Sequence, residues 1–110
     1  MTAEGQLFKV TRRQDESVVH FVLEGELDIA SAPVLLGYLQ DSITAGLHED
    51  ISLDVSLLDF VDSTGLSLLV TMQKRAEANG TKFTLYSPDE RFMKLLDVTN
   101  LRGYFDLGST

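Results

Sequence analysis

A strand–helix–strand pattern in the second half of the chain is the feature that most limits the possible folds. Segments 51–56 (ISLDVS) and 81–86 (TKFTLY) predict strands, and residues from about 64 to 79 carry apolar side chains at helical spacing. Strands joined through a helix pair in parallel, with a right-handed crossover. The stripe that should be buried comprises Leu66, Leu69, Val70, Met72 and Ala76, with Leu68 at its edge. The pattern therefore predicts an α/β fold.

The first half of the chain predicts a hairpin followed by another helix. Segments 6–13 and 17–24 are typical of strands around a turn at 14–16, and so short a connection favours antiparallel pairing. A helix should follow, with Ser31 as its N-cap and Gly46 as its stop. The hairpin makes the predicted sheet mixed.

The last quarter of the chain predicts a third helix and a short ending. Ser87 is the expected N-cap, with Pro88 at the first helical position and Glu90 completing a capping box. The side chains expected to face the core are Phe92, Leu95 and Leu96. Residues 101–107 predict a short final strand or turn. The expected order is β-β-α-β-α-β-α, a mixed sheet of four to five strands with helices packed mainly on one face.

Composition excludes several classes of function. The chain has 110 residues, with 9 Lys and Arg against 17 Asp and Glu, a formal charge of -8. An acidic surface repels phosphate backbones and lacks the basic cluster that attracts membranes, so we expect no direct nucleic-acid or membrane partner. The absence of cysteine removes disulfides, thiolate zinc sites and cysteine nucleophiles. With no secretory signal and no apolar run near the roughly 20 residues of a membrane span, we expect one cytoplasmic domain over 1–110, without cofactor or metal.

The loop that leads into the helix after segment 51–56 carries the strongest functional signal. Ser63 stands at a helix N-terminus, where unpaired N–H groups and the helix dipole accommodate a phosphate well. Asp62 would either orient Ser63 or cap the helix, and Gly65 would let another backbone or a phosphate approach closely. A cap alone also explains an Asp-Ser-Thr-Gly sequence, since capping contributes about 1 kcal/mol.

Three segments together resemble a known family. The stretch LDVSLLDFVDSTGL (53–66) is similar to the signature of STAS domains, specifically of bacterial anti-sigma-factor antagonists. Residues 25–28 (GELD) resemble the family's Gly-Glu-(Leu/Ile)-Asp segment, and 95–101 followed by Phe105 resemble its closing helix and turn. The resemblance covers nearly the whole chain and implies a STAS-type sandwich.

The resemblance also implies a partner switch in which this protein is a substrate and not an enzyme. Ser63 matches the family's phosphoacceptor. Unphosphorylated antagonists bind an anti-sigma factor, which is itself a serine kinase that holds ATP, and thereby free a sigma factor. Phosphorylation releases the antagonist, and a PP2C-type serine phosphatase restores it. The protein itself would be a monomer or weak dimer.

The resemblance extends to a set of partner-binding positions around Ser63. Asp28 matches a family position beside the phosphorylation site, where it would contact the partner or align the hydroxyl, although it could equally cap a turn. Thr64 would be a secondary acceptor or structural, and Leu68 would join the partner surface or the core. A phosphate on Ser63 would add about -1.5 to -2 charge beside Asp28 and Asp62, acting as a local electrostatic and steric switch. The expected set is Asp28, Asp62, Ser63, Thr64, Gly65 and Leu68.

An enzyme is the obvious competing interpretation of the same residues. Ser63 could pair with His20 or His48 in a nucleophilic hydrolase, but it does not stand in a Gly-x-Ser-x-Gly elbow. Asp59 and Asp62 could suggest acid–base or metal chemistry, but no cluster of ligand-type residues accompanies them. The sequence therefore favours a protein without catalytic activity.

Two non-enzymatic alternatives also exist. Asp54, near the end of segment 51–56, could indicate a phosphoacceptor receiver domain, but receivers alternate strands and helices from the start and this chain opens with two strands. Within the STAS fold, the chain could be a non-switching subunit of a lipid-transport ATPase complex or a stressosome-like scaffold. Ser63 and the short chain favour the antagonist.

Overall fold

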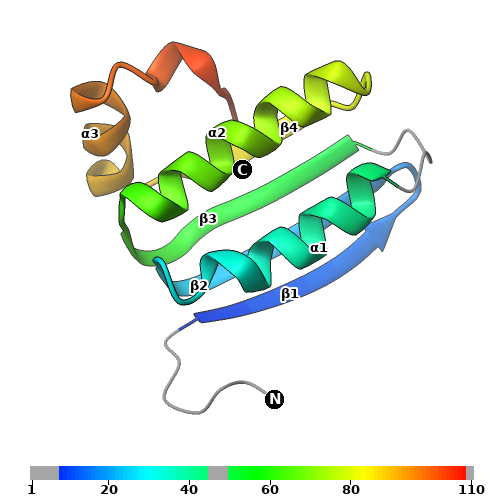
Figure 1. The fold of residues 1–110 in the computed structure, drawn as a ribbon, viewed down its shortest axis with the longest axis horizontal. Helices are drawn as coiled ribbons and strands as arrows, with labels where there is room; N and C mark the ends of the chain where they lie inside the picture. Colours follow the sequence, from blue (N-terminus) through cyan, green and yellow to red (C-terminus); the bar gives the residue numbers. More distant parts are fainter. Residues whose placement is uncertain (1–7, 45–49, 109–110) are drawn as a thin grey trace.

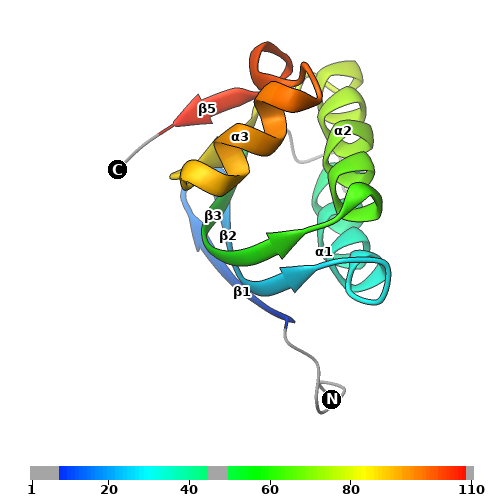
Figure 2. The same ribbon diagram turned by 90° about the vertical axis from the view of Figure 1, so that its left-hand side faces the viewer.

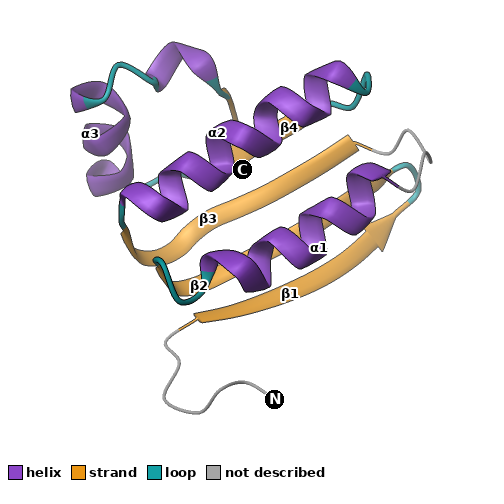
Figure 3. Ribbon diagram, in the orientation of Figure 1, coloured by secondary structure: helices purple, strands orange, loops and turns teal. Residues whose placement is uncertain are grey.

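The spatial order of the strands follows the order of the chain, giving one five-stranded sheet, β1-β2-β3-β4-β5. The computed structural model describes residues 8–44 and 50–108, and Figure 3 shows how helices and strands succeed one another. The elements are β1 (Phe8–Asp15), β2 (Val18–Leu27), α1 (Ala32–Thr44), β3 (Asp50–Val61), α2 (Ser63–Ala78), β4 (Phe83–Tyr86), α3 (Glu90–Val98), the 3₁₀ turn η1 (Arg102–Tyr104) and β5 (Asp106–Gly108).

The sheet is mixed, as the sequence predicts. β1 and β2 form an antiparallel hairpin, whereas β2, β3, β4 and β5 pair in parallel. The connecting helices α1 and α2 lie side by side on one face of the sheet (Figure 1). α3 lies at the end where β2 and β3 finish and α1 and α2 begin (Figure 2). The predicted order and one-sided helix packing are confirmed, and β5 supplies the fifth strand.

The core forms between the sheet and the two long helices. The face of the sheet under the helices contributes side chains such as Phe21 in β2 and Leu53 in β3, both fully inaccessible. From α2 the predicted stripe is buried except for Val70, which is half-buried at the edge of the core. Gln73 of the same helix is also buried, which the sequence does not predict because its side chain is polar.

The start of α3 differs from the predicted capping box. Ser87 is not the N-cap: its backbone has φ 57°, and its N–H donates to the Gly108 carbonyl at 2.8 Å. The cap is Asp89, whose Oδ1 accepts from the Phe92 N–H at 2.9 Å. The prediction was wrong because Ser87 is held by the neighbouring strand β5, a tertiary contact that a local motif does not reveal.

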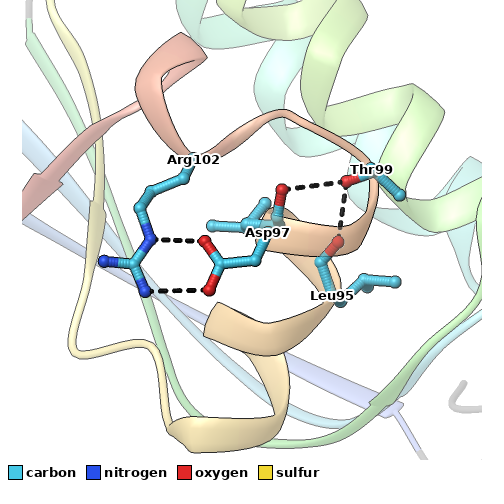
Figure 4. A network of polar contacts seen from close by, with 5 residues as sticks. Leu95, Asp97, Thr99 and Arg102 are labelled. Atoms are coloured by element: carbon cyan, nitrogen blue, oxygen red, sulfur yellow. Dashed lines mark hydrogen bonds and ion pairs between the residues drawn. The ribbon is translucent and has the colours of Figure 1, made fainter.

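A polar network closes the other end of α3 (Figure 4). The Thr99 hydroxyl donates to the Leu95 carbonyl at 2.7 Å, and Arg102 forms two bonds to Asp97, at 2.6 and 3.1 Å. Both members of this ion pair are about half exposed, so it stabilises the fold by no more than about 1 kcal/mol. The ion pair mainly orients the chain, since it joins the end of α3 to the turn η1 that leads into β5.

Element bounds differ from prediction mainly in β3. This strand continues to Val61, beyond the predicted end at 56, while β4 starts at Phe83. The predicted stop at Gly46 and the His48 turn lie outside the described residues, as does the predicted strand start at 6–7. Within 8–44 and 50–108, no helix has the length and apolar character needed to cross a membrane.

Candidate functional site at two neighbouring loops

Two loops meet at the end of the sheet where α1 and α2 begin (Figure 1). The last residues of β2 and β3, Leu27 and Val61, are paired in the parallel ladder, so both strands release the chain at the same edge. The Asp62 N–H continues this contact by donating to the Leu27 carbonyl at 3.1 Å. The loop after β2 therefore lies directly beside the loop that precedes Ser63.

Asp62 joins the two loops through its side chain. It is the N-cap of α2, with Oδ1 accepting from the Gly65 N–H at 2.9 Å. Its second oxygen, Oδ2, accepts from the Ile29 N–H at 3.2 Å, 33 residues away in the chain. Of the two roles that the sequence leaves open for Asp62, the structure shows the cap.

Asp28 organises the turn between β2 and α1. Its Oδ1 accepts from the backbone N–H groups of Ala30 and Ser31, both at 3.0 Å. The Ser31 hydroxyl accepts from the Asp28 N–H at 2.9 Å and donates to the Glu26 carbonyl at 2.7 Å. Asp28 thus caps this turn, the structural alternative in the sequence analysis. Ser31 stands directly before α1 as predicted, but these hydroxyl bonds run back toward β2.

These bonds lower the pKa of the Asp28 carboxyl below its usual value of 3.8. The main cause is the hydrogen bond from the Ser31 backbone N–H. Desolvation opposes it, while the Ser31 hydroxyl and the Ala30 N–H act in the same direction as the main cause. A carboxyl with a lowered pKa in the folded state stabilises the fold above its unfolded-state pKa.

We therefore expect the stability difference between the wild type and Asp28→Asn to depend on pH. Wild type should be the more stable protein at pH about 7, and this advantage should disappear as the pH falls through the lowered pKa of Asp28, below about 3.8. Urea unfolding of both proteins across this range measures the difference. Asparagine keeps an acceptor oxygen, so a difference that is the same at every pH would contradict a role for the charge.

Ser63 and Thr64 are both exposed in the first turn of α2, so a macromolecule can reach either hydroxyl. Gly65, by contrast, is buried against β2: a Cβ atom there would lie 2.6 Å from the Leu27 carbonyl oxygen and 2.7 Å from Leu27 Cγ. The close approach predicted at Gly65 is therefore that of a backbone. Leu68 is half-buried and packs against the core.

The strongest feature that the sequence analysis missed is Ile29. It is 73% exposed, although its backbone N–H is held by Asp62 Oδ2. In the sequence, the only sign of an exposed apolar side chain here is that Ile29 directly follows the Gly-Glu-Leu-Asp segment. Phe60, near the end of β3, is also exposed.

Among the residues that the structure describes, no histidine lies beside Ser63 as a hydrolase would require. His20 lies near the start of β2, 3.9 Å from Asp15 at the hairpin, whereas Ser63 follows the opposite end of the parallel strand β3. No group of three or more His, Cys, Asp or Glu residues suited to a metal ion occurs within residues 8–44 and 50–108. His48 falls outside these ranges.

Comparisons with known proteins agree with this architecture. A family model described as STAS domain matches residues 9–110. The anti-sigma-B factor antagonist of Bacillus subtilis (strain 168) is 30% identical over 97 residues, which is 88% of this chain and 87% of that protein. Thermotoga maritima TM1081 has a TM-score of 0.80 at 27% identity, covering 92% of this chain and 86% of its own. The Bacillus cell fate determinant SpoIIAA, solved in its phosphorylated form, shares the fold with a TM-score of 0.73 at 23% identity, over 94% and 91% of the two chains. With the matching family model and the shared fold, the chain belongs to the STAS domain family.

Proposed function

We propose that this protein is an anti-sigma-factor antagonist regulated at Ser63. In the unphosphorylated state it binds a serine kinase that is also an anti-sigma factor, which frees the sigma factor. The observation that carries the proposal is an exposed serine at the first position of α2, held beside a second ordered loop. The relation to the Bacillus subtilis anti-sigma-B factor antagonist supports it over 88% of the chain.

In the proposed cycle the protein is the substrate and the partners perform the chemistry. The kinase holds ATP and transfers its γ-phosphoryl group to Ser63 Oγ, with loss of the hydroxyl proton and release of ADP. A PP2C-type phosphatase then hydrolyses the phosphoserine with water and releases inorganic phosphate. The role of this chain is therefore regulatory and requires no cofactor of its own.

The surroundings of Ser63 explain why phosphorylation would release the partner. The new group adds about -1.5 to -2 charge at a site that already has the carboxylates of Asp28 and Asp62. Inside the domain the N-terminus of α2 tolerates this charge. At a packed interface the phosphate adds bulk and must lose its water, so the complex is weakened without a large change in the domain.

Phosphorylation and binding assays with the cognate kinase test the proposal. Serine kinases encoded beside this gene would be incubated with the protein and ATP, and the phosphorylated site mapped by mass spectrometry. We expect phosphate on Ser63, unchanged binding for Ser63→Ala, and binding weakened about tenfold for Ser63→Asp, because the introduced charge lies at the interface.

Ser67 provides a matched control, since it is exposed one turn further along α2. Ser67→Asp adds the same charge at a different point and should weaken binding less than Ser63→Asp. A protein that no neighbouring kinase phosphorylates, or a Ser63→Asp variant that binds as tightly as wild type, would contradict the proposed switch.

A further inference from the structure

Ile29 exposes more of its side chain than any other large hydrophobic residue of the described chain. It is 73% exposed, compared with 69% for Val98 and 51% for Phe60. Single exposed apolar residues are common on protein surfaces, so exposure alone has little meaning. The position of Ile29 beside the loop that leads to Ser63 is what distinguishes it.

The backbone on both sides of Ile29 is fixed by the two aspartates of the site. The Ile29 N–H donates to Asp62 Oδ2 at 3.2 Å, and the next two N–H groups, of Ala30 and Ser31, donate to Asp28 Oδ1. A side chain on such a fixed loop loses less conformational freedom on binding than one on a free loop. Since Asp62 directly precedes Ser63, this bond holds the loop of Ile29 beside the loop that presents the serine.

The charge of the surrounding chain indicates the chemistry of the partner surface. The ends of β2 and β3 and the loops after them carry five acidic residues: Glu24, Glu26, Asp28, Asp59 and Asp62. The basic residues described beside them are Lys9 of β1, which pairs with Glu24, and Arg91 of α3, which lines a shared hollow with Asp59. The balance of charge at this end of the sheet is therefore acidic. A surface of this sign attracts a basic partner over a distance of about 10 Å at moderate salt.

We propose that Ile29 is the apolar anchor by which this protein binds the kinase that acts on Ser63, and that this kinase offers an apolar pocket with a basic rim. The inference rests on the proposed function and assigns the affinity for the kinase and the control of the complex to two different residues. Burial of Ile29 provides affinity in the unphosphorylated state, whereas the charge state of Ser63 decides whether the complex persists. A central apolar anchor with a polar surround is a common arrangement of binding energy in interfaces.

Binding constants of the cognate kinase for matched variants test the role of Ile29. Ile29→Ala should weaken binding about tenfold, and Ile29→Glu about a hundredfold, because a carboxylate would enter an apolar pocket. Val98→Ala and Val98→Glu are the controls, since Val98 is almost equally exposed but lies at the end of α3. All four variants change one of two exposed positions, and thermal unfolding of each variant verifies that the fold is retained.

Salt dependence tests the basic rim separately. Raising the ionic strength from about 50 to about 300 mM should slow association of wild type and Ile29→Ala by the same factor, because the long-range attraction does not involve Ile29. An association rate that does not change with ionic strength would contradict the proposed basic rim.

The outcomes distinguish this inference from the proposed function. If Ile29→Ala binds as wild type does while Ser63→Asp is weakened, the anchor is wrong and the switch stands. If the Val98 variants lose as much affinity as the Ile29 variants, the anchor is again wrong. If the wild type neither binds nor is phosphorylated by the cognate kinase, the proposed function fails and the inference fails with it.

Discussion

Gly65→Ala should lower the free energy of unfolding by about 2 kcal/mol, although the same substitution normally favours a helix. The added methyl group would lie 2.6 Å from the Leu27 carbonyl oxygen and 2.7 Å from Leu27 Cγ. Backbone cannot turn aside as a flexible side chain can, so α2 would have to move away from β2. For a domain of this size, a loss of about 2 kcal/mol lowers the melting temperature by about 8 °C. Urea unfolding and thermal unfolding both measure this effect.

Gly37→Ala is the matched control for this prediction. Gly37 lies within α1, is exposed, and has no atom within 4 Å of the position that a Cβ would occupy. Alanine there should raise the stability by about 0.5 to 1 kcal/mol through its better helix propensity. Equal effects of the two substitutions would contradict the close contact between α2 and β2.

Asp62→Ala should lower the free energy of unfolding by about 2 to 3 kcal/mol, because it removes two interactions at once. The N-cap bond to Gly65 is worth about 1 kcal/mol. The bond from Ile29 to the charged Oδ2 adds about 1.5 kcal/mol. Chemical unfolding of the variant measures the sum of the two losses.

The other side-chain N-cap provides the control for Asp62→Ala. Asp89→Ala removes the cap of α3, where the described bond is the one to Phe92, and should lower the stability by only about 1 kcal/mol. Asp62→Asn keeps an acceptor oxygen and is a preferred N-cap residue, so it should lower the stability less than Asp62→Ala does. If Asp62→Ala and Asp89→Ala have equal effects, the bond between the two loops contributes nothing measurable.

Much of the fold could be predicted because the local signals agree with one another. Segment 51–56, the helix after it and segment 81–86 require a parallel pair with a crossover, and β3, α2 and β4 form that unit. The hairpin could also be predicted, since the strands on either side of 14–16 are separated by too few residues for a crossover. These features depend on residues close in sequence, where periodicity is informative.

The bounds of β3 and the cap of α3 could not be predicted, for two different reasons. The pairing of β2 with β3 shifts register between Val22 and Glu24 and again between Gly25 and Glu26, so simple alternation is lost after residue 56. At α3, both Ser87 and Asp89 are good caps by composition. The choice depends on the bond between Ser87 and Gly108, which only the folded sheet provides.

The candidate site shows the same division between local and distant information. Motif position places Ser63 at the start of a helix, and the structure puts it there. The bond between Asp62 and Ile29 joins residues 33 apart and has no local signature. The exposure of Ile29 likewise has no signature in the sequence around it.

The way Asp28 and Asp62 use their oxygens also has a consequence for the lifetime of the proposed mark on Ser63. Between them they hold the backbone N–H groups of Ile29, Ala30, Ser31 and Gly65. A phosphoryl group added to the exposed Ser63 would not need to displace these bonds and would stay in contact with water. A group that the fold does not enclose can be removed as readily as it is added, so the signal would be erased at a rate set by the phosphatase and not by unfolding of the domain.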